Sequence, residues 1–136
     1  MSTRSMIAFH NGDSVYAIYC HNDGYLDCNG RILLKHYTDI EKVEELIDLG
    51  DLSCLGEEIG QKQNFNRPTS HKWCLAYKRD RGDPSEVTDA LTFSTVEEAV
   101  SYYTDCDYFY LFDGNKWAWR DHNCDWRELT KEDIYA

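Results

Sequence analysis

The sequence predicts an α+β fold, a mainly antiparallel sheet built from hairpins with two or three helices packed on one face. Two kinds of pattern carry this prediction. Runs of β-favouring residues flank Asn-Gly and Asp-Gly-Asn turns, and amphipathic helical stretches separate these hairpins. Hairpins interrupted by helices are typical of an antiparallel sheet with helices against it. With 136 residues, the chain has the length of a single domain spanning residues 1–136.

The first predicted element is a hairpin formed by residues 5–10 and 14–20 around Asn11-Gly12. Asn-Gly favours the positive φ that matches the twist of paired strands. The second strand alternates, with apolar residues on both faces, which predicts a central strand. One face carries Val15, Ala17 and Tyr19, and the other carries Tyr16, Ile18 and Cys20.

Two helices are predicted next. The segment 21–25 and the following Asn29-Gly30 predict a compact loop, a place where functional residues often lie. A helix is predicted from about Gly30. A second helix follows a capping box, Thr38 to Glu41, and is expected to end at Gly50. Its apolar stripe comprises Ile40, Val43, Leu46 and Ile47, and its opposite face carries Glu41, Glu44, Glu45 and Asp48.

The second half of the chain repeats the pattern. Residues 51–60 predict a turn with one further helical turn, 61–70 a flexible loop, 71–78 a strand, and 79–89 a loop. A short strand at 91–93 precedes a helix that begins at a capping box in 94–98. Residues 108–112 and 116–119 flank Asp113-Gly114-Asn115 as a second hairpin, and the tail 126–136 predicts a short strand or helical turn.

Charge and composition exclude several classes of function. The formal net charge is −11, so the chain repels nucleic-acid phosphates and anionic membranes. Direct nucleic-acid binding and membrane association are therefore not expected, whereas a basic protein partner would be attracted. The N-terminal residues lack a signal-peptide core, and no stretch approaches ~20 apolar residues. A cytoplasmic location with reduced cysteines is predicted.

Five groups of residues are candidates for chemistry. Cys20 beside His21 could form an activated thiolate, although neighbours on a strand point to opposite faces. The Cys and His spacings lack a Cys-x-x-Cys pair, and no metal site or cofactor is predicted. The aromatic cluster of Trp117, Trp119, Trp126, Tyr108 and Tyr110 is expected to pack in the core.

The fourth group is a set of candidate ligand-binding residues for a nucleotide or phosphate. Guanidinium groups pair bidentately with anionic oxygens, and the Lys78-to-Arg81 cluster is the densest positive region of an acidic chain. The candidates are His21, Asp23, Tyr25, Arg79, Arg81 and Arg4. Intramolecular partners for these arginines among the nearby Asp residues are the alternative.

Acidic residues are dense between residues 39 and 58, with eight carboxylates opposed by Lys42. The simplest interpretation is a solvated helix face. The functional alternative is a negative surface that imitates nucleic acid and competes for a basic groove on another protein. The candidate partner-binding residues are Glu41, Glu44, Glu45 and Asp48.

Several motifs resemble a family of small uncharacterised phage and prophage proteins. They are Met1 to Ser5, Tyr19-Cys20-His21 with Asp23-Gly24-Tyr25, Asn29-Gly30, Leu33-Leu34 with His36-Tyr37, Leu49 to Ser53 with Leu55-Gly56, Arg79 to Gly82, and Tyr110 to Gly114 with Trp117. Asn22 stands where the family pattern has an aromatic residue. The resemblance implies a viral accessory protein acting in a bacterial cytoplasm, and it implies no reaction.

Three functions follow as hypotheses. The first is a phage-encoded acidic protein that binds, and inhibits or redirects, a host cytoplasmic protein, as an anti-defence protein or a nucleic-acid mimic. The second is a nucleotide or phosphate binder using His21, Asp23, Arg79 and Arg81. The third is a small enzyme using Cys20 or His21, for which no complete catalytic set is visible.

Overall fold

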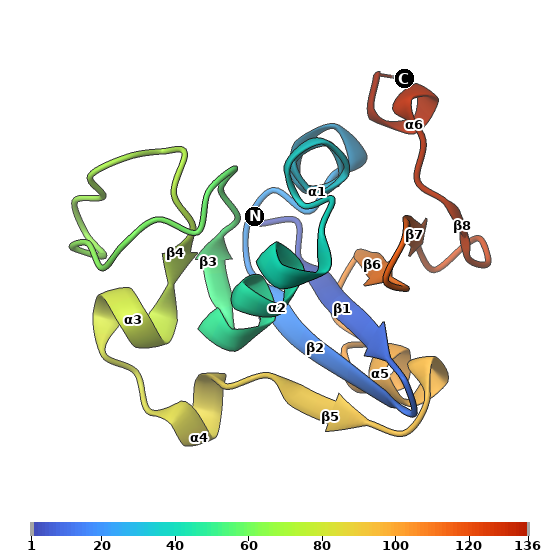
Figure 1. Cartoon of the computed structure of the whole chain (residues 1–136), viewed down its shortest axis with the longest axis horizontal. Coiled ribbons are helices and arrows are strands. Elements are labelled where there is room, and N and C mark those ends of the chain that lie inside the picture. The colour runs from blue at the N-terminus through green and yellow to red at the C-terminus, as the bar shows by residue number, and fades with distance from the viewer. Residues whose placement is uncertain (1, 136) are drawn as a thin grey trace.

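The computed structural model describes residues 2–135; Met1, the first residue of the Met1-to-Ser5 motif, and Ala136 lie outside this range. Its strands form one sheet in the order β4-β3-β2-β1-β6-β7-β8, with β5 also paired to β2, and helices lie against it (Figure 1). This is the predicted α+β fold, and most strand pairs are antiparallel.

The strands are β1 (Ser5–Asn11), β2 (Ser14–Cys20), β3 (Leu52–Cys54), β4 (Leu75–Ala76), β5 (Leu91–Phe93), β6 (Tyr108–Phe112), β7 (Trp117–Arg120) and β8 (Arg127–Glu128). The helices are the π-helical turn η1 (Leu26–Gly30), α1 (Arg31–His36), α2 (Ile40–Leu49), α3 (Tyr77–Arg81), α4 (Ser85–Thr88), α5 (Val96–Tyr102) and α6 (Lys131–Tyr135).

The β1–β2 hairpin is the centre of the sheet, as its two apolar faces predict. Asn11 pairs with Ser14, so the turn residues are Gly12 and Asp13 rather than Asn11 and Gly12. Gly12 has a φ of +64°, which is the positive φ that a two-residue hairpin turn with glycine first requires. The predicted hairpin is thus confirmed, with its turn one residue further along.

Each face of the sheet carries its own apolar cluster. Ile7 and Ile18 belong to the larger cluster, which α1 and α2 cover, and Ala8 and Ala17 belong to a smaller one. Ala99 of α5 packs into the smaller cluster. Figure 1 shows α2 in front of the β1–β2 hairpin and α5 behind it. The expectation that the helices pack on one face is therefore wrong, because β2 alternates apolar residues toward both sides.

Most aromatic residues of the second hairpin belong to the larger cluster, whereas Phe109 belongs to the smaller one. Tyr110, Trp117 and Trp119 are all at most 7% exposed. The Trp117 Nε1–H donates to the Tyr37 carbonyl at 2.8 Å, which satisfies its polar atom inside the core. Core packing of these rings is therefore confirmed, whereas Trp126 packs against the smaller cluster.

Helix α2 begins at Asp39, whose carboxylate accepts from the Lys42 N–H, and not at the predicted Thr38. Helix α2 ends before Gly50, as predicted, but Gly50 has a φ of +80° and a ψ of −160°, which lies outside the left-handed helical region. Helix α5 has the predicted capping box. The Thr95 hydroxyl accepts from the Glu98 N–H at 3.2 Å, and the Glu98 carboxylate accepts from the Ser94 N–H.

The predictions for residues 51–60 and 71–89 are largely wrong, whereas residues 61–70 contain no named helix or strand, as the predicted loop requires. The segment 51–60 contains strand β3 in place of a helical turn, and the predicted strand 71–78 is reduced to the two residues of β4. The predicted loop 79–89 contains most of α3 and all of α4. Asp80 stabilises the start of α3. Its carboxylate accepts from the Ala76 N–H at 2.8 Å and from the Gln63 N–H at 3.0 Å. The second of these contacts is not local.

Asp51 occupies a gap along the outer edge of β2. Strand β5 pairs with Val15 to Ala17, and β3 pairs with Cys20. Between these two partners, the Tyr19 N–H donates to the Asp51 carboxylate at 2.9 Å. Asp51 therefore acts as a strand partner and does not belong to the solvated acidic face on which the sequence places it.

Candidate functional site: an acidic cleft beside α2

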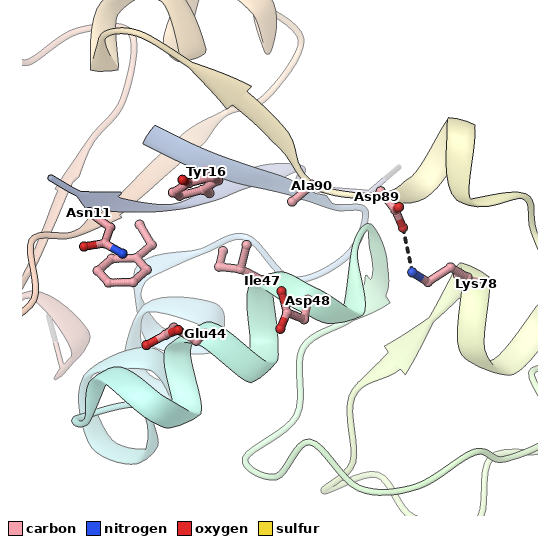
Figure 2. A pocket seen from close by; sticks show the side chains of 9 residues that line it. Asn11, Tyr16, Glu44, Ile47, Asp48, Lys78, Asp89 and Ala90 are labelled. Atoms are coloured by element: carbon pink, nitrogen blue, oxygen red, sulfur yellow. Dashed lines mark hydrogen bonds and ion pairs between the residues drawn. The ribbon is translucent and has the colours of Figure 1, made fainter. Parts of the chain in front are cut away.

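The cleft lies between α2, the face of the β1–β2 hairpin that α2 covers, and the segment that enters β5. It has a volume of about 540 Å³. Its floor is apolar, made by Phe9 and Ile47, which are 4% and 5% exposed, and by the half-buried Tyr16. Figure 2 shows Ile47 pointing from α2 toward β2, with Glu44 and Asp48 on the same helix. The cleft thus has an apolar floor and a charged rim.

The rim is mostly negative. Glu44, Asp48 and Asp89 supply three carboxylates, and Lys78 supplies the one cationic group among the described residues that line the cleft. The Lys78 Nζ lies 2.6 Å from the Asp89 carboxylate and forms an ion pair with it, drawn in Figure 2. Glu44 and Asp48 form no ion pair or side-chain hydrogen bond among residues 2–135. Two carboxylates therefore remain free to receive a cation.

Helix α2 positions these two carboxylates by its spacing. Glu44 and Asp48 are four residues apart, so they stack on one side of the helix. Ile47, on the adjacent stripe, turns into the core and fixes the rotation of the helix. Of the four predicted partner-binding residues, all exposed, Glu44 and Asp48 line the cleft, whereas Glu41 and Glu45 do not.

No protein-family model, curated protein or solved structure matches this chain. The geometry of the described residues therefore carries the functional argument.

The predicted ligand-binding residues are not brought together. Asp23 lines a second cavity that includes none of His21, Tyr25, Arg79, Arg81 or Arg4. The His21 Nδ1 lies 2.8 Å from the Tyr19 hydroxyl, and the Tyr25 ring, 49% exposed, contacts Tyr108 edge-on.

The three arginines of that prediction are occupied by neighbouring groups of the chain. Arg79 pairs with the buried Asp80 and donates to the carbonyls of Ile59 and Cys74. Arg81 pairs with Asp83 at 2.7 Å and lies over the rings of Phe65 and Tyr77. Arg4 pairs with Asp105 at 3.1 Å. These three arginines therefore fit the alternative interpretation, in which their partners are Asp residues of the same chain.

Cys20 is placed where it cannot act as a nucleophile. Its side chain is 0% exposed, and its sulfur lies near the Asn22 carbonyl and the Asn29 amide rather than His21. Burial raises the pKa of the Cys20 thiol to about 12, so the thiolate does not form near neutral pH. The pairing of Cys20 with His21 that the enzyme hypothesis requires is absent from these contacts.

Residues 2–135 contain no group of three or more His, Cys, Asp or Glu side chains arranged to hold a metal ion. All six cysteines, each within the described range, are unpaired thiols. Among the described helices, none has the length and apolar character needed to cross a bilayer.

Sequence reasoning missed three cleft residues: Tyr16, Lys78 and Asp89. Tyr16 was visible as the polar-tipped member of an otherwise apolar strand face. Lys78 belonged to the recognised basic cluster, but its partner Asp89 lies 11 residues away. These three residues come close to α2 only when the chain folds.

Proposed function

We propose that this chain is a phage accessory protein that binds, and inhibits or redirects, a basic host cytoplasmic protein through the acidic cleft. The observation that carries the proposal is the pair of unpartnered carboxylates, Glu44 and Asp48, above an apolar floor. The phage origin and the bacterial host are what the sequence resemblance implies.

A lysine or arginine side chain of the partner fits this cleft. Such side chains lay their methylene groups along apolar surface while the charged head stays at a polar rim. Phe9, Tyr16 and Ile47 provide the apolar surface, and Glu44 and Asp48 provide the anionic rim. The Lys78–Asp89 ion pair at the same rim is an intramolecular example of the contact.

The net charge of −11 supports the same proposal at longer range. A strongly negative chain attracts a basic partner before contact, which accelerates association and makes it sensitive to salt. Basic grooves that bind nucleic acid are the natural targets of such a surface. A partner held there could not bind nucleic acid at the same time, which gives the proposed inhibition its mechanism.

The test uses a fluorescent lysine- and arginine-rich peptide and measures its binding by anisotropy. The double variant Glu44→Gln/Asp48→Asn should weaken binding about tenfold, and raising salt from about 50 to 300 mM should weaken wild-type binding strongly. Capture from bacterial lysate, with both proteins as bait, then asks whether a basic protein depends on the same two residues.

The matched control is Glu41→Gln/Glu45→Gln, which removes the same charge from the same helix outside the cleft. Its binding should stay close to wild type. Equal losses in the two double variants would show that only overall charge matters and would contradict the cleft as the contact site. If the wild-type protein does not bind the peptide at low salt, the whole proposal is contradicted.

A further inference from the structure

A second cavity, separate from the acidic cleft, lies beside the π-helical turn η1. Its volume is about 460 Å³, and it is bounded by η1, by α1 and by the segment that follows β3. Ile32 and Leu55 give it apolar wall, and the rest of the lining is polar or charged. This size is within the usual range for small-molecule sites, about 300–1,000 Å³.

Cationic and imidazole side chains gather at this cavity although the chain as a whole is acidic. Arg31, Lys35, His36 and His71 line it, against the carboxylates of Asp23 and Glu57. The acidic cleft has the opposite balance, three carboxylates against one lysine. Local cations of this kind can hold one anionic group even where a long polyanion would be repelled.

Arg31 is held in place by the chain itself. Its Nε and Nη2 both donate to the Asp27 carbonyl at the start of η1. Nη1 has no such bond among residues 2–135. The guanidinium is therefore oriented, with one nitrogen free for an anionic oxygen of a ligand.

Asn29 supplies an acceptor without a partner. The residue lines the cavity and is 1% exposed. Its Nδ2 donates to the Asn22 carbonyl and to the Ser5 hydroxyl, both at 3.2 Å, and the carbonyl partner fixes which way the amide faces. The Asn29 Oδ1 has no hydrogen-bond partner among the described residues. Buried acceptors are rarely left unpaired, so this oxygen would gain a partner from a water molecule or from a ligand donor that reaches it.

The backbone around Asn29 is unusual in two ways. It lies in a π-helical turn, and such turns are frequent at functional sites. The Asn29 N–H donates at 3.0 Å to the carbonyl of Asp23, whose φ of +60° is the one positive value for a non-glycine residue in the described chain. A positive φ at a non-glycine residue costs free energy, and such residues cluster at active sites and ligand-binding sites.

We propose that this cavity binds a small phosphorylated molecule that also carries N–H or O–H donors, with a nucleoside monophosphate as the representative ligand. Arg31 receives the phosphate, and Asn29 and Asp23 accept from the donor end. This site replaces the predicted one at Arg79 and Arg81, of which it retains only Asp23. It is independent of the acidic cleft.

The test is calorimetric titration of the full chain with four nucleoside monophosphates, ribose 5-phosphate, inorganic phosphate and adenosine. At least one nucleotide should bind about tenfold more tightly than inorganic phosphate or adenosine, because only it engages both ends of the cavity. Equal binding of ribose 5-phosphate would support the same chemistry and assign the donor end to the sugar. In a ¹H–¹⁵N spectrum, the side-chain amide of Asn29 should shift on binding.

Arg31→Gln should weaken nucleotide binding about tenfold or more, since a charge-assisted contact to phosphate is lost. Arg67→Gln is the matched control, because Arg67 is exposed and does not line the cavity. No binding by any phosphorylated compound at millimolar concentration would overturn the proposal. So would a nucleotide affinity that Arg31→Gln leaves unchanged, or inorganic phosphate binding as tightly as the nucleotides.

Discussion

Asp51 should make the protein less stable as the pH rises through about 6. Its carboxylate accepts the Tyr19 N–H, which favours the charged form, but burial outweighs this and raises its pKa from 3.8 to about 6. The negative charge of Asp89 adds to the rise. Because the folded-state pKa lies above the unfolded one, the folded protein binds more protons between these values. The stabilising contribution is complete below pH ~4 and is lost as pH rises through ~6.

The magnitude follows from the pKa difference. One pKa unit corresponds to about 1.4 kcal/mol, so ionising Asp51 costs the folded state at most about 3 kcal/mol. Water still reaches this half-buried carboxylate, and screening reduces the figure to about 1.5 kcal/mol. Asp51→Asn keeps an oxygen to accept from Tyr19 but cannot ionise. At pH 7.5 we expect it to raise the free energy of unfolding by about 1.5 kcal/mol, roughly 5 °C in Tm.

The assay is urea unfolding of wild type and variant at intervals from pH 4 to 8. The difference between the two free energies of unfolding should be near zero at pH 4 and grow through pH 6; taking the difference removes the titration of other groups. Asp51→Ala leaves the Tyr19 N–H unpaired, so it should be about 1–3 kcal/mol less stable than Asp51→Asn at every pH. Asp48→Asn, an exposed control, should change little. A difference that is flat with pH, or an Asn variant as unstable as the Ala variant, would refute the reasoning.

Three further predictions concern stability and reactivity. Gly50→Ala should destabilise the protein by at least about 2 kcal/mol in urea unfolding, because a φ of +80° with a ψ of −160° suits glycine almost alone and a Cβ would overlap the Thr88 carbonyl. Thr95→Ala should cost about 1 kcal/mol by removing the cap on the Glu98 N–H, and Thr95→Ser should restore most of it. Cys20 should resist iodoacetamide at pH 7.5 until urea unfolds the chain; peptide mapping that finds it modified in the folded protein would contradict its burial.

The sequence alone determined the elements whose causes are local. Glycine-containing turns specified both hairpins, although Gly12 and Asp13 form the first turn. The apolar stripe specified α2, and Thr95 with Glu98 specified the start of α5. The apolar residues on both faces of β2 also predicted a central strand, and β2 does lie inside the sheet, between β1 and β3. These signals act over a few residues, so they can be read without knowing what packs against them.

The strand order and the residues that line the two cavities could not be predicted from such local patterns. Strand β6 lies parallel to β1, about 100 residues away in sequence, and its alternating residues contribute to both apolar clusters. Tyr77 begins a helix instead of ending a strand because Asp80 accepts from Gln63 as well as from Ala76. Such contacts depend on which distant segments pack together, and a local sequence pattern does not indicate this.

The candidate sites divide in the same way. Glu44 and Asp48 were predicted because helical spacing places them on one exposed side. The floor that makes them a cleft comes from β1, β2 and the segment before β5, and the unpaired Asn29 oxygen arises only when η1 packs against Ser5 and Asn22. Charge and periodicity are properties of the chain, whereas cavities and unsatisfied polar atoms are properties of the packing between distant segments.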